Sequence, residues 1–224
     1  MKWPRRGALV ERRLRWGLTW RGWLALLAIV AAAATYGFRH MLDFLAVRDP
    51  VPAHVLVIES WLGDIDLDAA VAICRGGHYD RVYLTGGPLE YSDPMHKFQT
   101  YPELLDLDLI DRGIPAHLLV PVPAPREKRD RTYSSALALR RWFLAHGGPP
   151  PALDIVTTAQ HSRRTRLLFE HALGDRVRIG MIPIWSPDFD HHRWWRSSQG
   201  AKEVLVEMIG YLYARVQVAW LTAS

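Results

Sequence analysis

His54-Val-Leu-Val-Ile58 is a short, continuous apolar run, and it decides the fold that this 224-residue chain should adopt. A run without polar alternation is typical of a strand that is covered on both faces, as in a parallel sheet. Four further runs of this kind follow at intervals that leave room for helices. We therefore expect strands at residues 54–58, 81–85, 117–120, 153–158 and 177–182.

Helical patterns fill the intervals between these strands, and glycines close several of them, such as Gly76-Gly77 and Gly174. We expect helices at residues 67–75, 96–112, 132–146, 162–173 and 198–221, with Asp64 or Asp66 as the cap of the first and with Pro102 as an alternative, later start of the second. Alternating strands and helices imply parallel pairing through right-handed crossovers. The sequence therefore predicts a three-layer, Rossmann-like α/β domain with a mainly parallel five-stranded sheet.

Residues 22–38 form an uncharged apolar segment behind a strongly basic leader. As a helix this segment would be about 25 Å long, close to the roughly 30 Å of a bilayer's hydrocarbon core. Tryptophans at its start and Tyr36 and Phe38 at its end are typical of interfacial aromatic belts. The arginines before it predict a cytoplasmic N-terminus and a single-pass protein of the plasma (inner) membrane.

Two other interpretations of this segment stay open. A cleaved signal peptide also has a basic leader and an apolar stretch, and the alanines at 31–34 could supply its cleavage site. A buried core helix is the other alternative, although no polar residue gives the run a solvent face. With an anchor, the chain divides into a basic cytoplasmic leader (1–21), a transmembrane helix and exit (22–45) and an extracytoplasmic α/β domain (46–224).

The net charge of +5 is unevenly distributed along the chain. Residues 1–48 hold nine Lys and Arg against two acidic residues, whereas the remainder has nineteen basic and twenty-one acidic residues. The basic excess thus lies beside the predicted membrane span, where it can meet anionic lipid head groups. A nucleic-acid partner would need that excess on the folded domain, so we expect none. Cys74 is the single cysteine and excludes an intramolecular disulfide.

Ligands of open parallel sheets bind beyond the carboxyl ends of the strands, and the segments expected there are rich in cationic and hydroxyl groups. Glu59 and His161 are candidate acid–base groups. Glycines admit close approach by backbone N–H groups, helix N-termini offer donors, and arginine binds anion oxygens bidentately. The candidate ligand-binding residues are Thr85, Gly86, Gly87, Arg131, Thr132, Arg163 and Arg164. This hypothesis requires His161, Arg131 and the Gly86-Gly87 turn to share one rim.

Two stretches contain metal-binding residue types but lack a complete set of ligands. Residues 64–68 alternate three aspartates without the glycine and the distant glutamate of a calcium loop, and helix capping explains them. Residues 188–192 place two aspartates and two histidines in one loop, which rarely makes a site without distant partners. We expect no metal site, and the sequence names no cofactor.

Six motifs together resemble the YdcF-like family, whose anchored members include the SanA and ElyC proteins of bacterial envelopes. They are Val57-Ile-Glu-Ser-Trp-Leu62, Leu84-Thr-Gly-Gly-Pro88, Thr100-Tyr-Pro-Glu103, Arg129-Asp-Arg-Thr-Tyr-Ser134, Thr157-Thr-Ala-Gln-His-Ser-Arg-Arg164 and Trp194-Trp-Arg-Ser-Ser198. The resemblance covers residues 53–215 and implies a Rossmann-like domain with a role in envelope biogenesis or lipid-carrier metabolism. It adds Glu103 to the candidate bases. Many relatives have a glycine-rich end to the first strand, where this chain has Glu59-Ser60-Trp61.

Two functions from different classes follow. In the first, the domain binds and transforms a small anionic, phosphorylated ligand such as a lipid-carrier or cell-wall precursor, with Glu59, Glu103 and His161 as catalytic groups. In the second, the same rim recognises a head group or a partner without chemistry. The sequence lacks a nucleophile elbow or a complete phosphate loop, and so leaves open whether the protein is an enzyme. It also leaves the oligomeric state open.

Overall fold

The computed structural model describes residues 19–89 and 99–223, and the chain forms two units, residues 1–38 and 39–224. The helix α1 (Trp20–Arg39), which belongs to the first unit except for its last residue, covers the predicted apolar segment and begins two residues before it. None of its side chains is buried. Most of the predicted basic leader lies outside the described residues.

The second unit is built on five parallel strands, which confirms the predicted fold class. The strands are β1 (Val55–Glu59), β2 (Arg81–Gly86), β3 (Leu119–Pro123), β4 (Ala152–Thr158) and β5 (Arg178–Ile184), in the order β3-β2-β1-β4-β5. Because all strands run in the same direction, their carboxyl ends form one edge of the sheet.

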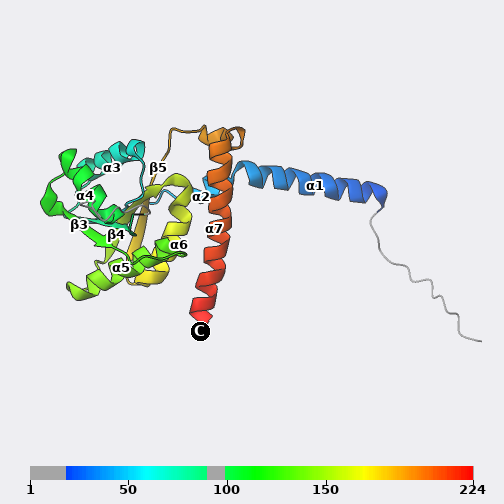
Figure 1. Ribbon diagram of the computed structural model, residues 1–224. Coiled ribbons are helices and arrows are strands. Elements are labelled where there is room, and N and C mark those ends of the chain that lie inside the picture. Colours follow the sequence, from blue (N-terminus) through cyan, green and yellow to red (C-terminus); the bar gives the residue numbers. More distant parts are fainter. Residues whose placement is uncertain (1–18, 90–98, 224) are drawn as a thin grey trace, which may run out of the picture. The chain divides into compact units, whose positions relative to one another are not determined.

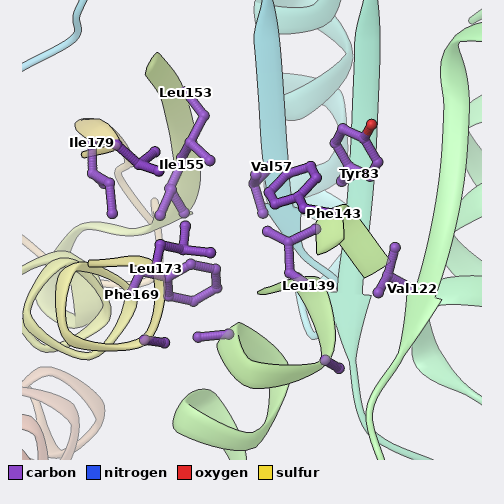
Figure 2. Close-up of a cluster of buried hydrophobic side chains, with 14 of the residues drawn as sticks. Val57, Tyr83, Val122, Leu139, Phe143, Leu153, Ile155, Phe169, Leu173 and Ile179 are labelled. Atoms are coloured by element: carbon purple, nitrogen blue, oxygen red, sulfur yellow. The ribbon is translucent and has the colours of Figure 1, made fainter. Parts of the chain in front are cut away.

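Helices cover both faces of this sheet (Figure 1). Alternate residues of β1 show the two faces: Val57 packs in a cluster with residues of α5 (Arg131–Ala145) and α6 (Ser162–Leu173). Leu56 and Ile58 pack in another cluster with residues of α3 (Asp64–Gly76) and α4 (Tyr101–Asp111). Figure 2 shows the first cluster, where side chains of the sheet meet those of α5 and α6. The uninterrupted apolar runs of the sequence arise because the strands are buried on both faces.

A third cluster joins elements that lie outside the sheet. The short helix α2 (Met41–Leu45), which the sequence analysis did not predict, packs against α7 (Ser198–Ala223) and the 3₁₀ segment η3 (His191–Arg196). Leu42 and Leu45 of α2 are fully buried there with Trp194. The cluster fixes the chain that follows α1 against the last helix.

Two described helices are long and apolar enough to cross a membrane, α1 and Ser198–Thr222 of α7. The two differ in their surroundings. The first half of α7 holds Glu203 and Glu207 in hydrogen bonds with the segment that follows β4. Since these contacts hold that half against the domain, we treat α7 as part of the α/β domain and α1 as the candidate span.

Several predicted boundaries were wrong. The first helix of the sheet domain begins at Asp64 with Gly63 at its N-cap, so neither Asp64 nor Asp66 is the cap. The second helix begins at Tyr101, next to the alternative start at Pro102 and not at residue 96, and Thr100 and Glu103 form a capping box. Residues 96–98 lie outside the described part. Residues predicted to start β3 form the 3₁₀ segment η1 (Ala116–Leu118) instead.

Strand β3 lies at one edge of the sheet and contains Pro121 and Pro123. The N–H of Ala124, just after the strand, donates to Gly86 O (2.8 Å), so alternate residues from Val120 onward face β2. The two prolines therefore face away from β2, and the strand loses no ladder hydrogen bond to them. Proline is tolerated in strands at this kind of position.

Asp154 and Gly180 lie side by side at the β4–β5 pairing and connect the sheet to the chain that precedes β1. Asp154 is buried; one carboxylate oxygen accepts from Val51 N (2.9 Å) and the other from the Tyr79 hydroxyl (3.1 Å). A Cβ at position 180 would lie 1.9 Å from Asp154 Oδ1 and 2.6 Å from Val51 N. Only glycine fits there.

We expect Gly180→Ala to destabilise the domain by about 1–3 kcal/mol, because the added methyl group overpacks a site with no free space. Thermal unfolding of the full chain in detergent measures this as a lowered Tm. Gly76→Ala is the matched control, since a Cβ there meets nothing within 4 Å and alanine favours a helix. Equal Tm values for the two variants would contradict the assignment.

Candidate functional site

The strand order reverses between β1 and β4, and the chain leaves these two strands toward opposite faces of the sheet. The segment after β1 leads to α3, and the segment after β4, η2 (Ala159–His161), leads to α6. In open α/β sheets this divergence creates a crevice at the carboxyl ends of the strands, where ligands bind. Glu59 at the end of β1 and His161 at the end of η2 lie at this point.

His161 is held by side chains from three helices. Its Nδ1 lies 2.9 Å from Glu207 Oε1, and its Nε2 lies 3.3 Å from Thr132 Oγ1 and 3.8 Å from Glu59 Oε2. Arg164 Nη2 is also 2.9 Å from Nδ1, but a guanidinium only donates, so the acceptor for an Nδ1 proton is Glu207. When Nδ1 donates to Glu207 in the neutral imidazole, Nε2 is the acceptor that faces Thr132.

Glu207 links α7 to the site through contacts with His161 and Arg164. Arg164 donates from Nε and Nη2 to its two oxygens, each at 2.9 Å, while His161 contacts Oε1. Burial alone would raise the pKa of Glu207, but hydrogen bonds and charges from His161 and Arg164 outweigh it and lower the pKa to about 2. The carboxylate is therefore ionised at neutral pH and orients the imidazole.

Glu59 is fully buried beneath His161. Its Oε2 accepts from the Thr165 hydroxyl (2.7 Å), while its Oε1 has no hydrogen-bond partner among the described residues. The hydroxyls of Ser60 and Thr157, also at the ends of β1 and β4, are buried and equally without a partner in the described chain. Buried polar groups of this kind are rare in structural cores and concentrate at functional sites.

Two adjoining cavities open over this edge of the sheet. The first, here named the His161 cavity, has a volume of about 560 Å³ and is lined by His161, Thr132, Arg164 and Glu207 together with the loop after β3. The second, the Gly87 cavity, has about 460 Å³ and is lined by Gly87, Pro88 and Arg126 among others. The residues Trp61, Tyr101, Lys128 and Arg131 line both. The loops after four strands therefore meet at one rim.

Cations dominate this rim, although the domain as a whole is slightly acidic. The His161 cavity is lined by Lys128, Arg129, Arg131 and Arg164 against two carboxylates, and one of these, Glu207, is already paired. The N-terminus of α5, with Arg131 and Thr132, also faces this cavity and adds the positive end of a 15-residue helix. The arrangement suits an anion with several oxygens.

Asp130 gives the loop its turn into α5. It is the residue before the helix and has φ 56° and ψ 33°, the left-handed conformation; no other described non-glycine residue has a positive φ. Aspartate adopts this conformation more readily than most residues, yet it remains uncommon. The turn directs Arg131 and Thr132 toward the His161 cavity.

The structure brings together only part of the predicted site. His161, Thr132, Arg131 and Arg164 share the His161 cavity, and Glu59 lies just beneath it. Gly87 lines the adjoining cavity, where a Cβ would meet nothing within 4 Å.

Four other predicted residues are engaged elsewhere. Thr85 is fully buried, and Gly86 packs closely against Pro102 and Ser60. The carboxylate of Glu103 accepts from the backbone N–H groups of Gln99 (3.0 Å) and Thr100 (3.1 Å), which makes it a helix cap. Arg163 donates to Phe44 O and lies 4.1 Å over the Phe44 ring, and lines neither cavity.

Glu207 was missed by the sequence analysis. The available signal was a glutamate at each of positions 203 and 207, one turn apart in a mainly apolar helix. Carboxylates on such a helix indicate a buried polar contact, but nothing in the sequence names His161 and Arg164 as partners. Trp61, which makes an edge contact with the His161 ring at 5.8 Å, was quoted only as part of a motif.

No group of three or more His, Cys, Asp or Glu residues in the described part of the chain could hold a metal ion. The residues of the 188–192 stretch have structural contacts. Asp188 accepts from the Ser186 hydroxyl (3.0 Å), Asp190 caps η3, and His191 contacts Ser186 O (2.6 Å). These contacts account for the side chains of Asp188, Asp190 and His191.

We expect Glu207→Gln to abolish part of the pH dependence of stability. A pKa lowered from 4.5 to about 2 stabilises the fold above pH 5, by an amount of the order of 3 kcal/mol, and this contribution is lost as the pH falls toward 2. Wild type should therefore exceed the variant in free energy of unfolding at pH 6, and the gap should narrow steadily to pH 3. Urea unfolding at a series of pH values measures this difference in free energy of unfolding. A difference that stays constant with pH would contradict a Glu207 carboxylate whose pKa is lowered by its partners.

Comparisons with known proteins add no assignment. No family model, no curated protein and no solved structure matches this chain. The resemblance to the YdcF-like family therefore stays a prediction from the sequence motifs, and the site stands on its geometry.

Proposed function

We propose that this protein is a membrane-anchored α/β protein of the bacterial envelope whose extracytoplasmic domain binds a small phosphorylated ligand at the rim. The observation that carries the proposal is the meeting of Lys128, Arg129 and Arg131 with the N-terminus of α5 in the His161 cavity. Phosphate oxygens are bound by this combination of cations and helix N–H groups. A lipid-carrier or cell-wall precursor supplies such a group at a membrane.

The imidazole of His161 gives the rim the means to move a proton. With Nδ1 held by Glu207, Nε2 can accept a proton from a hydroxyl in the cavity, and Thr132 Oγ1 already lies 3.3 Å away. Hydroxyl, imidazole and carboxylate in this order are the arrangement that activates a hydroxyl group in acyl- and phosphoryl-transfer enzymes. In the proposed function His161 is the acid–base group and Glu207 positions it.

A non-catalytic binding module is the second candidate, and one observation favours it. Thr132 is almost fully buried, with an exposed fraction of 3%, and Glu59 is fully buried, so neither group is directly open to a ligand. In that case the cations of the rim recognise a head group, and the network beneath them only holds the loops in place.

The localisation is supported by the length and composition of α1 and by the arginines that precede it. A cytoplasmic leader and an extracytoplasmic domain follow from the positive-inside rule. We expect alkaline phosphatase, which is active only outside the cytoplasm, to be active when fused to the C-terminus. Replacing Arg12, Arg13 and Arg15 by Glu should lower that activity. An inactive fusion in the unaltered chain would place the domain in the cytoplasm and contradict this topology.

The ligand class can be tested with geranyl diphosphate, a soluble prenyl diphosphate, and the full chain in detergent. We expect Arg131→Gln to weaken its binding about tenfold, because one charge-assisted hydrogen bond is worth 1.4 kcal/mol or more. Isothermal titration calorimetry measures the dissociation constant. Arg163→Gln is the control with the same change in charge, and it should bind like wild type because Arg163 lines neither cavity. An equal loss of affinity in Arg131→Gln and Arg163→Gln would show that the ligand is attracted by positive charge in general and not by a specific site.

The same samples separate catalysis from binding. With catalysis, wild type releases inorganic phosphate from geranyl diphosphate, and His161→Gln binds it but releases phosphate about 10²–10⁴-fold more slowly. Binding without release in wild type would favour the non-catalytic candidate. Failure of wild type to bind at all would reject a prenyl diphosphate ligand.

A further inference from the structure

A further basic cavity lies outside the rim, at the point where the chain leaves α1. Its volume is about 530 Å³, and its lining includes the arginines Arg39, Arg193 and Arg196. Arg39 is the last residue of α1, and the other two belong to η3, the 3₁₀ segment before α7. None of these residues lines the His161 cavity or the Gly87 cavity.

The positive charge of this cavity is not balanced by its own residues. Asp43 is the only carboxylate in the lining, and it is paired with His40, whose Nδ1 lies 2.8 Å from Asp43 Oδ2. Within the described residues Arg193 and Arg196 make no ion pair or side-chain hydrogen bond. Two exposed guanidinium groups that face one hollow suit an anion that accepts several hydrogen bonds.

An aromatic wall accompanies these cations. Trp195 lines the cavity, and the guanidinium carbon of Arg39 lies 5.9 Å from the centre of its ring. Tryptophan and arginine together are typical of the interface between a bilayer and water, where an amphipathic ring and a charge both find suitable surroundings. A lipid head group has apolar atoms that can contact the Trp195 ring, whereas an inorganic ion has none.

Connectivity fixes the depth of this cavity relative to a bilayer. If α1 crosses the membrane, Arg39 at its end must lie at head-group level, because a charge is costly in hydrocarbon. Asp43 follows four residues later, and α2, which carries it, is packed against η3 and α7. The cavity therefore opens within reach of lipid phosphates, and a volume of 530 Å³ exceeds what a single phosphate ion fills.

We propose that this cavity binds the phosphate-bearing head group of an anionic membrane lipid, with Arg193 and Arg196 on the phosphate and Trp195 beside the glycerol. A lipid bound there would hold the domain against the membrane surface in a defined orientation. The inference rests on the anchoring proposed for α1, but it is independent of the ligand at the rim.

Binding of short-chain lipids to the full chain in detergent tests it. The probes are dihexanoyl phosphatidylglycerol, dihexanoyl phosphatidylcholine and inorganic phosphate, each titrated by calorimetry at fixed ionic strength. We expect phosphatidylglycerol to bind at least about tenfold more tightly than either of the others. The double variant R193Q/R196Q should bind phosphatidylglycerol about tenfold or more weakly than wild type, because it loses two charge-assisted hydrogen bonds.

R140Q/R176Q is the matched control, because it removes the same charge from exposed arginines outside this cavity and should bind like wild type. Equal affinity for the two lipids would overturn the proposal, as would equal binding by the two double variants. Inorganic phosphate that binds as tightly as phosphatidylglycerol would reject a lipid ligand in favour of a free ion. Unfolding temperatures of all variants show that each is folded.

Failure of this inference can be distinguished from failure of the proposed function. The lipids reach the protein from water, so their binding does not depend on how α1 is oriented. R193Q/R196Q should still bind geranyl diphosphate like wild type, and Arg131→Gln should still bind phosphatidylglycerol. If both variants failed to bind both ligands, the cavity beside α1 and the His161 cavity would not be independent. That result would overturn the proposal of a separate lipid site.

Discussion

The carboxylate of Glu207 is the contact that joins the last helix of the chain to the crevice between β1 and β4. The imidazole of His161 and the guanidinium of Arg164 hold it ionised in a largely buried position. Removing one partner of such a pair leaves an unbalanced buried charge, which costs far more than an exposed salt bridge contributes. The orientation of His161, the position of α7 and the shape of the His161 cavity therefore depend on one another. A site assembled in this way has few alternative arrangements.

The pattern of apolar residues along the sequence was sufficient to predict the layers of the fold. Each strand is a short apolar run because the sheet is buried on both faces, and glycines mark the ends of several helices. The rule for ligands in parallel sheets also predicts that His161, Arg131 and Thr132 lie near one another, and all three line the His161 cavity. Boundaries were less accurate, as at β3, because the 3₁₀ turn before it and the prolines within it obscure the strand pattern.

The side-chain contacts within the candidate site could not be predicted from the sequence pattern. Glu103 has the residue type of a catalytic base, yet it serves Gln99 and Thr100 as a cap, which only the local geometry distinguishes. Arg163 and Arg164 are adjacent, but consecutive residues of a helix point in different directions, so one meets Phe44 and the other Glu207. Glu207 is 46 residues from His161 in the chain, and its partnership depends on how α7 packs against α6.

The prolines of β3 have a consequence for how copies of this chain can associate. Pro121 and Pro123 leave the outer side of that strand poor in N–H donors, so it is a weak template for intermolecular strand addition. The opposite border of the sheet is protected by a different device, because Asp49 bridges Met181 of β5 through two backbone hydrogen bonds of 3.0 Å. Sheet-to-sheet polymerisation is thereby discouraged at both borders of the sheet.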